Sequence, residues 1–236
     1  MKLLAWSIEE NENDTYTNAR YLIESAAVFN EQVEFIGVGK KFVELFDKIT
    51  TLRDYINNLS KNTFLVCIDG YDTLLNKDLS TLKDDFEKHN TKVIISTERI
   101  FTYQWNTFKD KFETISSPYR YVNSGTLIGY SDDLKIILDE CIELNKIYPT
   151  EIDQGIVGVW VYKNLENTNR VKLDIDCEFT WVVSGEWETL GKISENPEII
   201  NPTTGNKPYI IHSPGNGATS NFIPFKKAYK SIIKSN

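Results

Sequence analysis

Two aspartates follow the most apolar run of the sequence at a spacing that could bind a cation. Asp69 comes directly after the run Phe64–Ile68, and Asp72 follows three residues later. Two carboxylates at this spacing across a tight turn can converge on one hard divalent cation. If the run is a strand of an open α/β sheet, the turn lies where such sheets bind ligands. The same aspartates could instead cap the turn and a following helix, so both interpretations stay open on local grounds.

A histidine near the C-terminal end could complete such a site. His212 ends the short apolar run Tyr209–Ile211 and precedes a turn-prone segment that contains Gly215 and Asn216. Imidazole beside two carboxylates suits Mn²⁺ at least as well as Mg²⁺. The backbone N–H groups of the turn could point at phosphate oxygens. A single histidine after a strand is more often packed or hydrogen-bonded than a ligand, so His212 is a candidate on this evidence.

Polar residues also interrupt a segment that otherwise has the composition of a strand. Asn123, Ser124 and Gly125 lie in the middle of the run Tyr121–Tyr130. One interpretation is a bulge or a close approach of two backbones. The other is a row of hydrogen-bonding groups that faces a polyhydroxylated ligand. The residues alone do not choose between them.

Two more candidates come from a helix start and a loop. Asp153 and Gln154 begin a segment of helical composition, where an acidic side chain commonly complements the helix dipole. Trp105 lies in a loop-like segment, and aromatic faces can stack on sugar rings. Most tryptophans are core residues, and a charge at a helix start is common, so neither feature identifies a site by itself.

The elements that must position these residues alternate between strands and helices, which predicts an α/β fold. Strands are expected at Leu3–Trp6, Val33–Val38, Phe64–Ile68, Lys92–Ser96, Tyr121–Tyr130, Arg170–Asp174, Phe179–Val183 and Tyr209–His212. Helices are expected at Asn18–Phe29, Lys48–Leu59, Leu79–His89, Leu134–Tyr148 and from Asp153 to at least Val161. The segment Ser184–Pro208, rich in Gly, Pro, Asn and Glu, is predicted to be a loop.

Composition narrows the class of protein. The chain has 236 residues and no clear linker, so one domain over residues 1–236 is the simplest organisation. The net charge of -8 argues against a surface for bare nucleic acid or anionic lipid. Three scattered cysteines form no disulfide framework. No signal peptide and no membrane-spanning run is recognisable, so we expect a soluble protein.

The order of the motifs resembles the glycosyltransferase domain of procollagen lysyl hydroxylases. The segments that carry the resemblance are Phe64–Leu75, Ile95–Glu98, Arg120–Tyr130, Asp153-Gln154 and Tyr209–Gly217. The resemblance implies a GT-A fold, a single Rossmann-like domain with a mixed central sheet, that uses a UDP-sugar and Mn²⁺, with Mg²⁺ as an alternative. Together with the Lys-, Asn- and Ile-rich composition, it suggests a free-standing giant-virus enzyme that works in the host cytoplasm.

The same resemblance implies a role for each candidate residue. The metal ligands are Asp69, Asp72 and His212. The nucleotide-binding residues are Tyr71, which stacks on uracil, Lys48, which reaches the phosphates, and Trp6, Gly215 and Asn216. The sugar- or acceptor-binding residues are Asn123, Ser124 and Gly125, and the catalytic group is Asp153, Gln154 and Trp105. Residues 1–100 would mainly bind the nucleotide and residues 101–236 the sugar and acceptor. The Gly-rich segment that the family has before its lysine is replaced here by Phe42–Asp47.

The implied reaction is transfer of glucose from UDP-glucose to galactosylhydroxylysine of collagen or a collagen-like protein, with retention of configuration. The enzyme could act as a homo-oligomer. The alternatives are a UDP-galactose or UDP-xylose transferase on the same scaffold, and a non-catalytic module that binds a UDP-sugar or glycan. A phosphohydrolase with an Asp-x-Asp nucleophile loop is disfavoured, because Asp69 and Asp72 are three residues apart instead of two.

Overall fold

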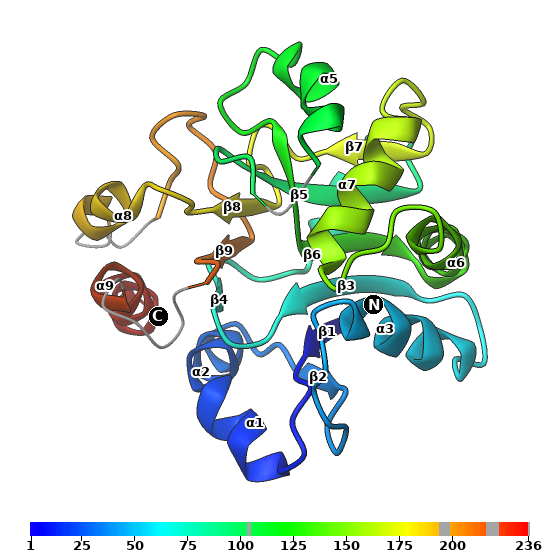
Figure 1. Ribbon diagram of the computed structural model, residues 1–236. Helices are drawn as coiled ribbons and strands as arrows, with labels where there is room; N and C mark the ends of the chain where they lie inside the picture. Colours follow the sequence, from blue (N-terminus) through cyan, green and yellow to red (C-terminus); the bar gives the residue numbers. More distant parts are fainter. Residues whose placement is uncertain (103–104, 194–198, 216–221, 236) are drawn as a thin grey trace.

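The computed structural model describes residues 1–102, 105–193, 199–215 and 222–235, and it confirms an α/β fold with a mixed central sheet (Figure 1). The described strands of the central sheet lie in the order β2-β1-β3-β6-β5-β7. Their bounds are β1 Lys2–Trp6, β2 Val33–Ile36, β3 Phe64–Asp69, β5 Val93–Glu98, β6 Tyr121–Tyr130 and β7 Val171–Leu173. A smaller sheet has the order β4-β9-β8, with β4 Thr73–Leu75, β8 Thr180–Val182 and β9 Ile210–His212.

Strand β6 runs against the direction of its two neighbours. It pairs antiparallel with β3 and with β5, whereas β1 pairs parallel with β2 and β3, and β5 with β7. The start of β6 therefore lies at the same sheet edge as the ends of β3 and β5. Because Ile68 pairs with Thr126, the polar residues that precede Thr126 lie close to Asp69.

The pairing of β5 with β6 contains a large irregularity. Ile95 pairs with Leu127, but Thr97, two residues further along β5, pairs with Val122, five residues back along β6. The polar tripeptide that begins at Asn123 lies within this irregularity. Extra residues on one strand locally bend it and re-aim its side chains. The irregularity therefore moves polar groups of β6 away from regular pairing with β5.

The smaller sheet joins the central sheet through the turn after β3. Strand β4 follows this turn and pairs antiparallel with β9, so Thr73 lies opposite His212. Strand β8 pairs parallel with the other side of β9. The backbone N–H of Ser213 donates to the carbonyl of Asp72 at 2.8 Å. These contacts bring the end of β9 beside the Asp69–Asp72 turn.

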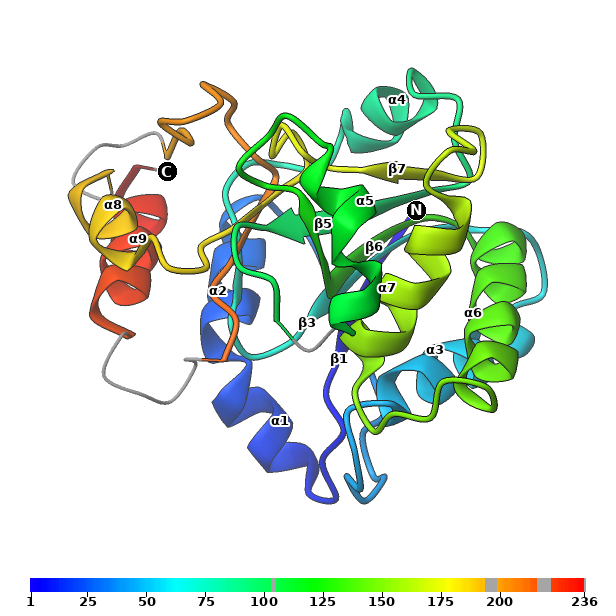
Figure 2. The same ribbon diagram turned by 45° about the horizontal axis from the view of Figure 1, so that its top comes forward.

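Helices cover both sheets. Their bounds are α1 Glu12–Asn18, α2 Arg20–Val28, α3 Asp47–Asn57, α4 Leu82–Glu87, α5 Lys109–Glu113, α6 Ser131–Asn145, α7 Asp153–Asn164, α8 Trp187–Ile193 and α9 Phe222–Ser235. Helices α3, α6 and α7 lie together on one face of the central sheet (Figure 2), where their apolar side chains join those of β1, β3 and β5. Helices α2 and α4 pack on the opposite face. Helices α8 and α9 contact each other and pack on the smaller sheet. No helix among the described residues is long and apolar enough to cross a membrane.

The structure confirms the expected strands and helices, with small shifts of their ends, and corrects one segment. Within Ser184–Pro208, which the composition predicts as loop, residues Trp187–Ile193 form helix α8. This helix is too short to show a helical period in the sequence. The buried Leu190 packs with Phe225 and Ala228 of α9, so tertiary contacts stabilise a helix that its own sequence does not indicate. The sequence pattern also predicts no element at α1, β4, α5 or α9.

A buried carboxylate organises the connection between β7 and β8. Asp174 accepts hydrogen bonds from the backbone N–H groups of Glu178 at 2.8 Å, Phe179 at 3.0 Å and Thr180 at 2.7 Å. Asp174 is 1% exposed. The buried carboxylate therefore satisfies three backbone N–H donors of this turn.

We predict that Asp174→Ala lowers the free energy of unfolding by about 2–4 kcal/mol, because buried donors lose their acceptor. Urea unfolding followed by circular dichroism measures this change. Asp176→Ala is the matched control, since Asp176 is exposed in the same turn and its loss should change stability by less than about 0.5 kcal/mol. Equal stability of the two variants would contradict the role given to Asp174.

Candidate metal and nucleotide site

Three side chains converge at the point where the two sheets meet. Asp69 ends β3, Asp72 ends the following turn and His212 ends β9. Each offers one ligand atom within 4.8 Å of the others, and among the described residues they form the one such group of His, Cys, Asp and Glu side chains. The His212 Nε2 atom lies 3.4 Å from an oxygen of Asp69 and 3.4 Å from an oxygen of Asp72. The predicted metal ligands therefore lie together.

The histidine ring supports a cation at this position. His212 is 1% exposed, and neither of its ring nitrogens has a hydrogen-bond partner. Buried polar atoms in folded proteins are nearly always paired, so an unpaired imidazole needs an explanation. One imidazole nitrogen with two carboxylates is a donor set that suits Mn²⁺ or Mg²⁺. The residues present therefore fit a divalent cation.

The pKa values of His212 and Asp72 shift in opposite directions. Burial lowers the pKa of His212, but the attraction of Asp72 and Asp69 outweighs burial and raises this pKa above 6.5. Burial raises the pKa of Asp72, but His212 more than offsets it, so the Asp72 pKa lies below 3.8. The backbone N–H of Gly215 also donates to the Asp72 carboxylate. Without a cation, a protonated histidine supplies the positive charge beside Asp72.

Lys48 connects this cluster to Asp153. Its Nζ lies 2.6 Å from Asp69 Oδ1 and 3.0 Å from Asp153 Oδ2. Burial lowers the pKa of Lys48, but Asp153 and Asp69 more than reverse this and hold it well above 10.5, so the ammonium stays charged. The lysine comes from the first turn of α3 and Asp153 from the first turn of α7. A predicted metal ligand and the predicted catalytic carboxylate therefore share the Lys48 ammonium.

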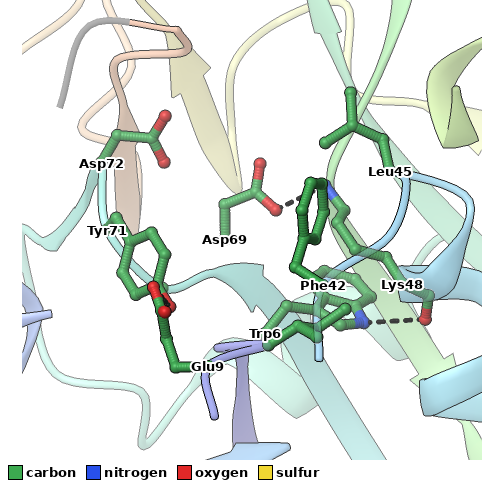
Figure 3. A pocket seen from close by; sticks show the side chains of 10 residues that line it. Trp6, Glu9, Phe42, Leu45, Lys48, Asp69, Tyr71 and Asp72 are labelled. Carbon is green, nitrogen blue, oxygen red and sulfur yellow. Dashed lines mark hydrogen bonds and ion pairs between the residues drawn. The ribbon is translucent and has the colours of Figure 1, made fainter. Parts of the chain in front are cut away.

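Trp6, at the end of β1, contacts both the backbone and the ammonium of Lys48. Its indole N–H donates to the backbone carbonyl of Lys48 at 3.0 Å, and the Lys48 ammonium lies 5.2 Å from the centre of the indole ring (Figure 3). The side chain is almost fully buried. Trp6 thus holds the predicted phosphate-binding lysine by both its backbone and its charge.

A cavity of about 390 Å³ opens beside the cluster. It is lined by Trp6, Ile8, Glu9, Phe42, Leu45, Lys48, Asp69, Gly70, Tyr71 and Asp72. Figure 3 shows Tyr71 on one side of the cavity and Phe42 on the other. The Tyr71 hydroxyl bonds to Ser7 at 2.8 Å and to Glu9 at 2.9 Å, which fixes the ring. One part of the cavity is therefore aromatic and the other is charged.

A buried polar network lies on the other side of Asp153. The Gln154 amide donates to Glu98 at 2.8 Å and to the Thr102 carbonyl at 3.1 Å. The Asn123 amide donates to the Gln154 side-chain oxygen at 3.3 Å, and the Ser124 N–H donates to the same oxygen at 3.4 Å. The network thus joins the end of β5, the irregular part of β6 and the start of α7.

Sequence reasoning assigned no role to Glu98, which is 2% exposed at the centre of this network. In the sequence Ser96 and Thr97 separate it from the apolar run, so it does not share the pattern that marks Asp69. Phe42 and Glu9 were also missed, because loop residues far apart in the chain give no sign that they line one cavity. Only the fold, which places them around the same cavity as Asp69, reveals them.

Some of the other predicted site residues lie at the metal and nucleotide site, and others lie outside it. Gly125 lies against the His212 ring, and Gly215 contacts Asp72. Trp105 packs in an aromatic cluster, with its ring centre 6.4 Å from that of Phe108 and 6.1 Å from that of Tyr148. It does not line the cavity. Asn216 lies outside the described residues.

Known structures share this arrangement of elements. A glycosyltransferase involved in glycosylation of the major capsid of PBCV-1 superposes with a TM-score of 0.57 at 12% identity, covering 98% of this chain and 97% of its own. Mouse xyloside xylosyltransferase 1 superposes with a TM-score of 0.58 at 12% identity, covering 92% and 99%. The protein has the GT-A glycosyltransferase fold of these neighbours, which confirms the expected fold class.

Similarity in sequence identifies the family as well as the fold. The multifunctional procollagen lysine hydroxylase and glycosyltransferase of Caenorhabditis elegans is 24% identical over 88% of this chain and 30% of its own length. The uncharacterized protein R699 of Acanthamoeba polyphaga mimivirus is 24% identical over 82% of this chain and 38% of its own. This chain thus spans about a third of the length of the curated relatives that it matches. The profile of the PLOD GT domain, the glycosyltransferase domain of procollagen lysyl hydroxylases, matches residues 1–229, and the chain belongs to this glycosyltransferase family.

Proposed function

We propose that the protein transfers glucose from UDP-glucose to galactosylhydroxylysine of a collagen-like chain, with retention of configuration and with Mn²⁺. The observation that carries this proposal is the convergence of Asp69, Asp72 and His212 beside a cavity that is aromatic at one part and charged at the other. The C. elegans relative, whose name includes lysine hydroxylase and glycosyltransferase, supports the choice of acceptor. Because the chain matches about a third of that relative, only its glycosyltransferase part is relevant.

Asp69, Asp72 and His212 would hold the cation. When bound, it supplies positive charge that stabilises the diphosphate as the bond to the sugar breaks. The orphaned nitrogens of His212 and the low pKa of Asp72 keep the donor set ready for a cation. The complete set favours an enzyme over a binding module.

The aromatic part of the cavity would bind uracil. Tyr71, fixed by Ser7 and Glu9, presents one ring, and Phe42 lies across from it. Lys48 would contact the phosphates, since it lines the cavity and its ammonium is paired with Asp69. A bound diphosphate would be a third anionic partner for Lys48 and would compete with Asp153 for its ammonium.

Asp153 would act on the acceptor hydroxyl. Its release from Lys48 upon donor binding would leave a carboxylate able to orient that hydroxyl or to stabilise the oxocarbenium-like state. Glu98, Gln154 and Asn123 form the polar wall beside it and would bind sugar hydroxyls. An acceptor hydroxyl held close to the anomeric carbon adds the proximity contribution.

We predict that UDP is released from UDP-glucose with Mn²⁺, that galactosylhydroxylysine stimulates the release, and that EDTA stops it. UDP-galactose and UDP-xylose are the parallel donors, and a coupled assay measures the UDP. Asp72→Ala should abolish the activity, because it removes a ligand of the cation. If acceptor-dependent release were faster from UDP-xylose, the transferred sugar would be xylose and not glucose. Binding of UDP without release from any donor would instead indicate a non-catalytic module.

We predict that Mn²⁺ binds more weakly as the pH falls. The ligand form of His212 is the neutral imidazole, so protons compete with the cation below its raised pKa. The apparent affinity should level off above the raised pKa of His212 and fall by about tenfold per pH unit below it. Electron paramagnetic resonance of free Mn²⁺ measures it. His89→Ala, which changes the other histidine, should give the same curve, and a flat profile from acidic to basic pH would exclude His212 as a ligand.

We predict that Asp153→Asn lowers kcat by about 10²- to 10⁴-fold and leaves Mn²⁺ binding intact. Asparagine keeps the shape of the side chain but cannot accept a proton or stabilise positive charge in the same way. Steady-state kinetics with UDP-glucose and acceptor measure the loss, and the melting temperature checks the fold. Turnover near that of the wild type would remove Asp153 from the mechanism.

A further inference from the structure

The space that the His212 ring occupies depends on the absence of a side chain at Gly125. A Cβ atom at position 125 would lie 2.1 Å from His212 Cε1 and 2.6 Å from His212 Nδ1. Its other near neighbour would be Asn123 Oδ1 at 2.9 Å. Real Cβ atoms do not approach other atoms this closely, so any side chain here requires a displacement of the ring.

The backbone of His212 cannot readily move away. Strand β9 lies between β4 and β8, where His212 pairs with Thr73 on one side and Val182 on the other. Its carbonyl also accepts a hydrogen bond from Val183 N–H at 2.8 Å. Any displacement must therefore come from the side chain itself, which is enclosed and 1% exposed.

The ring also has no free space on its other edge. Its Nε2 atom faces the oxygens of Asp69 and Asp72, 3.4 Å from each. The Cε1–Nδ1 edge lies against the backbone of Gly125. The imidazole is thus held between two carboxylates and a glycine, and a shift away from the glycine changes the distances to the carboxylates.

Gly125 is itself held in place by the irregularity of β6. Its N–H donates to Asn123 Oδ1 at 3.0 Å, and the Ser96 hydroxyl donates to the Asn123 carbonyl at 2.8 Å. Because regular pairing with β5 is interrupted here, these bonds take the place of the ladder. They keep the Gly125 backbone against the histidine ring.

We propose that Gly125 is a positioning residue of the metal centre: it sets the place of the His212 ring by steric contact alone. This inference rests on the proposed function only in that His212 is a ligand of the divalent cation. It gives Gly125 a role in addition to the sugar or acceptor contact predicted from the sequence. It also explains why the polar interruption of β6 contains a residue without a side chain.

The first test is a double-mutant cycle on stability, without metal. We expect Gly125→Ala to lower the melting temperature by roughly 4–10 °C, as overpacking does. In a His212→Ala background the same substitution should cost less than half as much, because the ring that it displaces is gone. The smaller loss that remains would come from the contact of the new Cβ atom with Asn123 Oδ1. Equal losses in both backgrounds would overturn the proposal. If Gly125→Ala alone does not fold, folding of the double variant supports it, and failure of both contradicts it.

Gly129→Ala is the matched control on the same strand. A Cβ there would lie 2.5 Å from the backbone carbonyl of Lys92, far along β6 from the histidine. It should destabilise the protein equally with and without His212. A rescue of Gly129→Ala by His212→Ala would show that the cycle does not report the ring contact, and would count against the inference.

The second test measures Mn²⁺ binding by electron paramagnetic resonance at a temperature where each variant is folded. Gly125→Ala should weaken binding by about 10- to 100-fold, the usual effect of changing a residue that orients a ligand. Unchanged affinity would overturn the proposal. Wild-type protein that binds no Mn²⁺ would refute the metal in the proposed function, while the stability cycle would still decide whether Gly125 positions the ring.

Discussion

The ion pairs of Lys48 with Asp69 and Asp153 are the interaction on which the site depends. Together with Asp72, these carboxylates place several negative charges in a partly buried region, where repulsion is poorly screened. Lys48 on one side and His212 on the other provide the positive charge that lets them remain close. Both cations are enclosed by protein, so the arrangement keeps little freedom to relax. In the proposed reaction, a divalent ion and a diphosphate would bring further charge of both signs, which would allow these pairs to exchange partners.

This charge arrangement explains features of the scaffold that packing alone does not. Antiparallel β6 brings polar residues from the middle of the chain to the edge where β3 ends. Its irregular pairing with β5 leaves room for the Asn123–Gln154 contact and for the ring of His212. Strand β9 arrives from near the C-terminal end because β4 follows the aspartate turn directly and pairs with it. A regular sheet would separate these groups.

Much of the fold follows from local pattern. The run Phe64–Ile68 is apolar on both faces, as a strand covered by helices on both sides requires, and it lies inside the central sheet. Helix α8 was missed because its seven residues show no period and its stability comes from α9. For the site, residue types at strand ends identified Asp69 and His212, but not Glu98 or Phe42. Neither of the latter two differs from an ordinary surface or loop residue until its neighbours are known.

The sequence by itself determined the alternation of strands and helices, the positions of the acidic and histidine candidates, and the family to which their order belongs. These are properties of local periodicity and of residue type. The tertiary structure decided which candidates share a site: it placed Lys48 between Asp69 and Asp153, assigned Trp6 to the support of that lysine, and set Gly125 against His212. Strand order and direction bring these residues together across long stretches of chain, and no local pattern encodes the contact between a glycine backbone and a ring 87 residues away.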